Sequence, residues 1–162
     1  MATRREIAEY LKEAAANLFF RYRYSCTYEL GVEAWGRRRA DVVAVKLNGD
    51  IVIVEVKSSV PDFINDKKMK KYLKFCDRFY LCFTPEVWDK IKSKDKYLEH
   101  LPKRAGVIIL RKDGYAKIVK PCKIKKIDPE TRMAMLARLA WRSGDLSKRN
   151  KRARVRIFIG RD

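Results

Sequence analysis

The chain has 162 residues, of which 47% are hydrophobic, and carries a formal net charge of +19. This length suits one domain with a sizeable core, and the hydrophobic content excludes a disordered chain. So large a positive charge favours a nucleic-acid partner, with an acidic membrane surface or an acidic protein as alternatives. The single histidine, His100, excludes zinc sites and hydrolases that need several histidines.

The sequence predicts a soluble, cytoplasmic protein that does not insert into a membrane. It begins with an amphipathic segment rather than an apolar leader, and no stretch reaches the length of a membrane-spanning helix. The four cysteines form no CxxC pair, and three of them lie in apolar stretches. Such cysteines are typical of reduced thiols in a protein core rather than of a disulfide scaffold.

The first predicted elements are a helix and a strand. Thr3-Arg4-Arg5-Glu6 fits a capping box, and apolar residues at helical spacing continue the helix to about Phe20. Residues 22–32 alternate in a way that predicts a strand. One side of this strand would carry Tyr22, Tyr24, Cys26, Tyr28 and Leu30.

Two apolar runs follow a basic bend at residues 36–39. These runs, Ala40–Val45 and Ile51–Val56, flank Asn48-Gly49, which is a strong signal for a β-hairpin. Counting outward from the turn, we expect Asp41 nearly opposite Glu55, to within one residue of register.

The next segments predict more helices and a strand. Residues 62–75 are expected to form a charged helix, and Arg78–Phe83 a buried strand. Thr84-Pro85 and Asp128-Pro129 each place an N-cap residue before proline at the first helical position. We therefore expect one short helix after Thr84 and another from Asp128 to about Trp141.

A second hairpin and a basic tail complete the predicted organisation. Val107–Leu110 and Tyr115–Val119 flank Asp113-Gly114, another hairpin signal. Between Lys148 and Arg161 there are seven basic residues and no acidic one. We expect residues 1–143 to form one α/β domain with a mixed sheet, and residues 144–162 a basic tail that could add an edge strand at 154–159.

Asp41, Glu55 and Lys57 are the candidate catalytic residues. Glu55 and Lys57 share one face of their strand because side chains alternate, and Asp41 joins them if it lies on that face. Glu55 interrupts an apolar run, where an ionised carboxylate is costly unless it is paired or binds a metal. Two carboxylates suit Mg²⁺ or Mn²⁺ beside a phosphate, and Lys57 could orient a water or stabilise negative charge. The alternative is a structural role, because this spacing also arises by chance.

Several further motifs surround this site. They are Arg39-Ala40-Asp41, Ile53–Ser59, Asp62-Phe63, Asp66-Lys67-Lys68, Tyr72, Cys76-Asp77 and Phe79-Tyr80, with additional likeness at 101–108 and 132–142. Together they resemble the MmcB-like DNA-repair family of the PD-(D/E)XK nuclease superfamily. The chain departs from the family pattern at Met69, where tryptophan is usual.

The resemblance implies a restriction-endonuclease-like αβββαβ core with a mixed central sheet flanked by helices. It also implies a metal-dependent deoxyribonuclease, acting as an endonuclease or nickase in DNA repair or phage DNA metabolism, in a bacterial or phage-infected cell. A non-cleaving nucleic-acid-binding module on the same fold and an RNA-processing nuclease are the alternatives.

The resemblance also implies roles for individual residues. Asp41 and Glu55 would bind Mg²⁺ or Mn²⁺, the backbone carbonyl of Val56 would complete the site, and Lys57 would be the catalytic lysine. A further carboxylate can take part in this superfamily, and Glu29 and Glu33 are the candidates.

Basic and polar residues near the site are candidates for nucleic-acid contacts, which would position a substrate without reading its sequence. They are Arg37, Arg38, Arg39, Ser58, Lys67, Lys68 and Tyr72, with Lys148, Arg149, Lys151 and Arg152 in the tail. Lys68 and Tyr72 are four residues apart and would share a face of the predicted helix. Trp35 is a candidate for base stacking.

Overall fold

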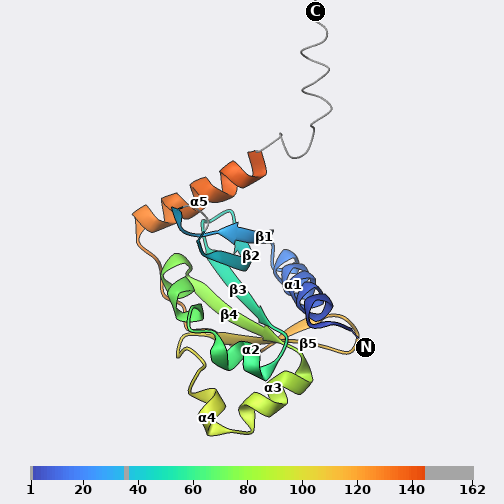
Figure 1. Cartoon of the computed structure of the whole chain (residues 1–162). Coiled ribbons are helices and arrows are strands. Elements are labelled where there is room, and N and C mark those ends of the chain that lie inside the picture. Colours follow the sequence, from blue (N-terminus) through green and yellow to red (C-terminus); the bar gives the residue numbers. More distant parts are fainter. Residues whose placement is uncertain (1, 35–36, 145–162) are drawn as a thin grey trace, which may run out of the picture.

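A computed structural model describes residues 2–34 and 37–144 of the chain. In these residues helices lie on both sides of one β-sheet (Figure 1). The elements in chain order are α1 (Arg4–Arg21), β1 (Ser25–Gly31), β2 (Arg39–Val45), β3 (Ile51–Lys57), α2 (Val60–Asn65), the 3₁₀ helix η2 (Met69–Phe75), β4 (Arg78–Phe83), α3 (Pro85–Lys92), α4 (Asp95–Leu98), β5 (Gly106–Leu110), β6 (Ala116–Lys120) and α5 (Pro129–Gly144).

The sheet is mixed and its six strands follow the order of the chain, from β1 to β6. β3 pairs in parallel with β4, and β4 with β5, whereas the other neighbours are antiparallel. Apart from the 3₁₀ helix η2, the elements from α1 to β4 follow the expected αβββαβ order, so the predicted fold class is confirmed. The crossover through α2 and η2 is what makes β3 and β4 parallel.

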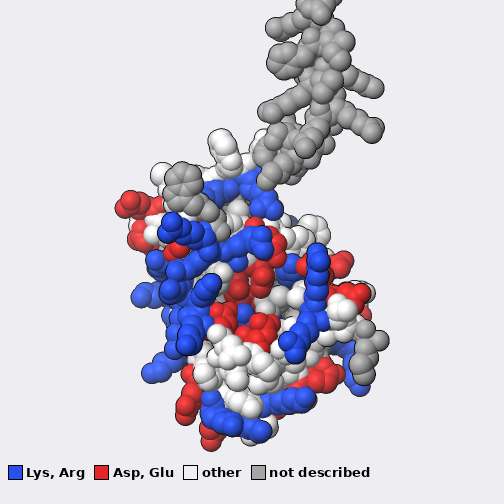
Figure 2. Space-filling model, in the orientation of Figure 1, with Lys and Arg blue, Asp and Glu red and all other residues white. Residues whose placement is uncertain are grey.

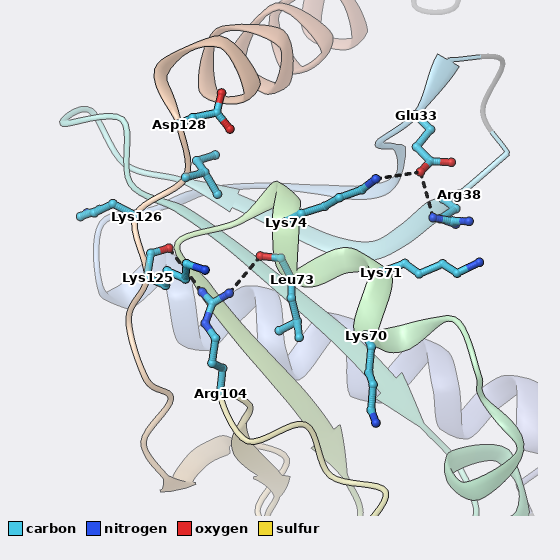
Figure 3. A pocket seen from close by; sticks show the side chains of 11 residues that line it. Glu33, Arg38, Lys70, Lys71, Leu73, Lys74, Arg104, Lys125, Lys126 and Asp128 are labelled. Atoms are coloured by element: carbon cyan, nitrogen blue, oxygen red, sulfur yellow. Dashed lines mark hydrogen bonds and ion pairs between the residues drawn. The ribbon is translucent and has the colours of Figure 1, made fainter.

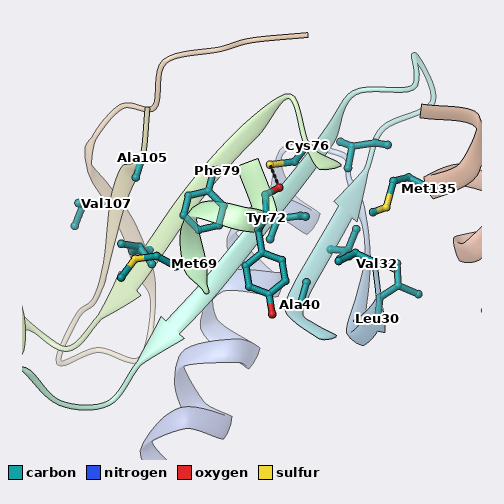
Figure 4. Packing of buried hydrophobic residues seen from close by; sticks show 14 of the residues in the cluster. Leu30, Val32, Ala40, Met69, Tyr72, Cys76, Phe79, Ala105, Val107 and Met135 are labelled. Atoms are coloured by element: carbon teal, nitrogen blue, oxygen red, sulfur yellow. Dashed lines mark hydrogen bonds between the residues drawn. The ribbon is translucent and has the colours of Figure 1, made fainter. Parts of the chain in front are cut away.

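Two hydrophobic clusters lie on opposite faces of the sheet. α1 packs on one face, with Leu11, Ala15 and Phe19 against the valines of β2 and β3. Side chains from α2, η2, α3 and α5 cover the other face. Figure 4 shows part of this cluster, including Met69 and Tyr72 of η2 and Met135 of α5. All seven residues of β3 are buried, because this strand has neighbours on both edges and layers on both faces.

Local signals in the sequence placed most element ends correctly. Thr3 and Glu6 form the predicted capping box, and Thr84 caps α3 ahead of Pro85. Both hairpins are present, and Gly49 and Gly114 adopt positive φ angles of 84° and 82° in their turns. The short helix α4 was not predicted. The tail from residue 145 onward, including its expected edge strand, lies outside the described residues.

The single helix predicted over residues 62–75 is wrong. α2 ends at Asn65, Asp66 has an extended backbone, and η2 begins at Met69 with 3₁₀ geometry. The break has a physical cause: the Asp66 carboxylate accepts hydrogen bonds from the N–H groups of Lys68 and Met69 and also pairs with Lys57. Aspartate that bonds nearby backbone N–H groups in this way competes with a continuous helix.

The predicted alternation of the first strand also fails, at Glu29. Glu29 has a φ of 55°, a left-handed conformation that is uncommon for a residue other than glycine. Tyr24 and Cys26 therefore lie on the α1 face, whereas Leu30 belongs to the cluster on the opposite face. Tyr28 is exposed.

Asp77, just before β4, forms hydrogen bonds with three segments that are distant in the sequence: the start of β3, the segment before α5, and α5 itself. Its fully buried carboxylate accepts hydrogen bonds from the N–H groups of Ile51 and Ile127, and two from Arg132 of α5, both at 2.7 Å. Burial acts to raise the pKa of Asp77, but these donors outweigh it and lower the pKa to about 2. This network fixes α5 against the β2–β3 hairpin, since Arg132 also donates to the Gly49 carbonyl.

We expect Asp77→Asn to lower the free energy of unfolding at neutral pH by about 3–5 kcal/mol, because it breaks a buried ion pair. Since the pKa of Asp77 is lower in the folded chain, its contribution is complete above about pH 4 and is lost as the pH falls towards 2. Urea denaturation across this range should show the two proteins converging in acid. The exposed Glu99→Gln is the control, and a difference independent of pH would contradict the expectation.

Candidate active site

Three carboxylate residues lie in register on neighbouring strands. The β2–β3 register pairs Val42 with Val54, so Asp41 comes opposite Glu55, as counted from the turn. The pairs Tyr28–Val42 and Leu30–Ala40 place Glu29 opposite Asp41 in the same way. A row of carboxylate positions therefore runs from β1 through β2 to β3.

Backbone N–H groups anchor the two central carboxylates. The Asp41 N–H donates to Glu55 Oε1 at 3.0 Å, and the Val56 N–H donates to Asp41 Oδ2 at 2.9 Å. The other oxygen of each carboxylate accepts no hydrogen bond from the described residues. The strand backbones thus hold the pair in place and leave one oxygen of each side chain available.

Burial makes this pair electrostatically costly. Glu55 is 5% exposed, and burial together with the negative charge of Asp41 raises the pKa of Glu55 well above its usual range. Burial also raises the pKa of Asp41. A buried carboxylate beside a half-buried one, each repelling the other, is an arrangement that a bound cation would stabilise.

Lys57 places a buried ammonium beside the pair. Its Nζ atom lies 2.6 Å from Asp66 Oδ2, and the residue is 5% exposed. Burial acts to lower the pKa of Lys57, but the hydrogen bond and charge of Asp66 outweigh it and raise the pKa. Lys57 is therefore charged at neutral pH, and its charge opposes, without reversing, the rise in the pKa values of Asp41 and Glu55.

α1 contributes a lysine that the sequence analysis did not identify. Lys12 is buried, and its Nζ lies 2.8 Å from Glu29 and 2.7 Å from Glu9. Burial raises the pKa of Asp41, and the positive charge of Lys12 partly opposes that rise. A lysine next to Leu11 on the apolar face of a predicted helix was the available signal, because a charge there needs a partner.

Glu29 is held between two cations. Besides Lys12, the guanidinium of Arg39 lies 2.5 Å from the Glu29 carboxylate. This double pairing accompanies the left-handed backbone of Glu29, and such strained residues cluster at functional sites.

Glu33, the other candidate carboxylate, is not brought to the pair. It accepts a hydrogen bond from Arg38 at 2.9 Å and lies 3.9 Å from Lys74. Among the residues the structure describes, no three Asp, Glu, Cys or His side chains form a group that could hold a metal. A metal here would depend on Asp41 and Glu55, which fits Mg²⁺, since this ion uses one or two carboxylates and completes its shell with water and substrate phosphate.

Tyr72 and Lys68 do not share a face as predicted, because η2 is a 3₁₀ helix rather than an α-helix. Tyr72 is buried and its hydroxyl donates to the Arg39 carbonyl at 2.9 Å, whereas Lys68 is exposed. Burial and the charges of Glu55 and Asp41 raise the pKa of Tyr72. Met69 fills the place where the family pattern has tryptophan, and it is buried in the core.

The remaining candidate contacts are scattered around this site. Arg37 and Lys67 are exposed, and the Ser58 N–H donates to the Asp62 carboxylate. Trp35 and the four tail residues lie outside the described residues.

We expect Glu55→Gln, in the presence of a chelator, to raise the free energy of unfolding at neutral pH, because it removes a buried charge that Asp41 repels. Because folding raises the pKa of Glu55, its ionisation disfavours the folded state once the pH exceeds the unfolded pKa, near 4.3. The gain should therefore vanish in acid and grow towards neutral pH in denaturation curves. Destabilisation at neutral pH, beyond that of Glu99→Gln, would contradict the expectation.

The comparisons with known proteins point to one family and one fold. The family model described as DNA repair protein MmcB-like matches residues 2–152. The SPO1766 protein of unknown function from Silicibacter pomeroyi is similar in structure, with a TM-score of 0.74, 24% sequence identity, and coverage of 89% of this chain and 92% of that chain. That likeness shows a shared fold.

A second solved structure, Pyrococcus furiosus SfsA in complex with Ca²⁺, has a TM-score of 0.31 and 14% identity, covering 75% of this chain and 65% of that chain. So slight a likeness supports no statement about this chain. No curated protein matches the sequence. None of the helices in the described parts of the chain has the length and hydrophobicity that a membrane span requires.

Proposed function

This chain belongs to the MmcB-like DNA repair protein family, and on that premise we propose that it is a metal-dependent nuclease that hydrolyses DNA phosphodiester bonds. We further propose that it acts as an endonuclease or nickase. The observation that carries the proposal is the meeting of Asp41, Glu55 and Lys57 at one end of the β2–β3 hairpin, where a half-buried and a buried carboxylate repel each other.

Asp41 and Glu55 are the residues that would hold Mg²⁺ or Mn²⁺, with the Val56 carbonyl as a further oxygen ligand. A divalent cation at such a site offsets charge on the phosphate and lowers the pKa of water to make it a better nucleophile. The backbone N–H groups that anchor both carboxylates keep their free oxygens in position, so the ligands need little rearrangement.

Lys57 would act on the scissile phosphate. Its charged ammonium is held by Asp66 at 2.6 Å and lies on the same face of β3 as Glu55. From there it can orient the attacking water or stabilise the negative charge that develops on the phosphate. Glu29 and Lys12 would position Asp41 from the neighbouring strand and helix rather than touch the substrate.

A non-cleaving nucleic-acid-binding module is the second candidate. It is favoured by the finding that the described residues offer two carboxylates, not three metal-ligating side chains, at the site. Cleavage measurements separate the two functions, and an RNA substrate tests the third possibility, RNA processing.

We expect the full-length protein to cleave supercoiled plasmid or single-stranded DNA when Mn²⁺ or Mg²⁺ is present. Chelator should abolish cleavage, and Glu55→Gln should slow it at least about 10²-fold, the cost of losing one transition-state-stabilising group. Glu99→Gln, an exposed carboxylate, should cleave at the wild-type rate. Binding without cleavage of DNA or RNA would favour the binding module, and cleavage of RNA alone would reassign the substrate.

We expect Mn²⁺ to raise the melting temperature of the wild-type protein, because it binds the folded carboxylate pair. At 100 times its Kd the gain is about 2.7 kcal/mol, or roughly 5–10 °C for a domain of this size. Glu55→Gln and Asp41→Asn should lose this shift. Lys57→Met should keep the shift, relative to its own metal-free melting temperature, while losing cleavage. A shift that persists in Glu55→Gln would place the metal elsewhere.

A further inference from the structure

The 3₁₀ geometry of η2 sorts its side chains into straight rows. With three residues per turn, positions three apart eclipse each other. Met69 and Tyr72 are buried in the core. Lys68, Lys71 and Lys74 are all exposed, so they form a row of cations along the outside of the helix, spaced by about 6 Å along its axis.

This lysine row connects the candidate active site to a basic hollow. At its start, the Lys68 N–H is bonded to Asp66, the partner of Lys57. At its end, Lys74 approaches Glu33, which lines a hollow of about 790 Å³ (Figure 3). Figure 2 shows basic side chains gathered over this side of the molecule, next to a hollow with acidic side chains over β3.

The opposite wall of the basic hollow comes from a distant part of the chain. Lys125 and Lys126 lie in the segment before α5 and line the hollow together with Lys70, Lys71 and Lys74 of η2, and Lys126 is paired with Asp50 at 2.8 Å. Arg104 braces the floor, donating to the carbonyls of Leu73 and Lys125. Cations therefore line both sides of the hollow.

The acidic residues of the hollow leave much of this charge unbalanced. Glu33 is paired with Arg38, and Asp128 uses its carboxylate to accept hydrogen bonds from Thr131 at the start of α5. Within the described ranges, Lys70, Lys71 and Lys125 have no carboxylate within ion-pair distance. Unpaired cations from two segments around one hollow are suited to a polyanion, and the apolar lining is confined to Leu73 and Ile127.

We propose that the basic hollow binds the phosphate backbone of a nucleic-acid strand that continues from the candidate active site along the lysine row. The inference rests on the proposed function, because it extends the substrate of that site. The spacing of the row suits a chain of repeated phosphates better than an isolated anion. A substrate that fills both places must reach several nucleotides beyond the bond at Lys57.

The test is binding of fluorescein-labelled single-stranded DNA, measured by anisotropy over a range of salt in the presence of chelator. The full-length protein is compared with the triple variant Lys71→Gln, Lys74→Gln, Lys125→Gln. The matched control is Lys90→Gln, Lys112→Gln, Lys117→Gln, which removes three exposed lysines on α3 and around the β5–β6 turn. Melting temperatures of both variants verify that they fold.

We expect the hollow variant to bind more weakly, with a slope of log K against log salt smaller by roughly 0.7 for each phosphate that the variant no longer neutralises. The control should retain the wild-type slope. Equal slopes in the two variants, or no DNA binding by the wild-type protein, would overturn the proposal. Because chelator is present, neither result depends on cleavage, so the nuclease assignment is judged separately.

We expect Glu33→Gln to change DNA affinity in the direction opposite to that of the triple lysine variant. Removing this carboxylate releases Arg38 and Lys74, so DNA should bind more tightly and with a steeper salt slope. A purely structural role for Glu33 would leave the slope unchanged or weaken binding, and either outcome would contradict a phosphate path through the hollow.

Discussion

β3 is buried along its whole length, although two of its seven residues, Glu55 and Lys57, are charged. The candidate site is formed by the groups that pair with these two side chains. Across the hairpin, Glu55 accepts a hydrogen bond from the N–H of Asp41. Lys57 donates to the carboxylate of Asp66. Because Asp66 must face Lys57, the chain bends there, and the continuous helix that periodicity favours cannot form. One buried strand thus determines both the site and the shape of the segment that follows it.

The sequence was informative wherever the cause of a structure is local. Asn48-Gly49 set the hairpin, the hairpin set Asp41 opposite Glu55, and Thr84-Pro85 marked the start of α3. It failed where partners come from elsewhere in the chain. The reversal at Glu29 accompanies pairing with Lys12 and Arg39, and the hollow joins Lys71 to Lys125 from segments far apart in sequence. Neither contact can be recognised from the spacing of apolar and polar residues in the sequence.

The positive net charge of the chain and the negative charge at the candidate site act on a phosphate in opposite directions. A net charge of +19 attracts phosphate, yet the centre of the site carries two carboxylates, those of Asp41 and Glu55, that would repel it. A divalent cation would reconcile the two, since it neutralises the pair and presents positive charge to the phosphate. Lys57 adds a permanent positive charge at the same place.

The row arrangement of η2 has a consequence for how the chain tolerates changes in length. Inserting or deleting one residue there would rotate everything beyond it by about 120°, turning a lysine into the core and Tyr72 or Phe75 towards water. The turn at Gly114 has open space around its glycine and carries no such constraint. This short helix, with lysines on its outer side and core residues on its inner side, is therefore as intolerant of a one-residue insertion or deletion as a buried strand would be.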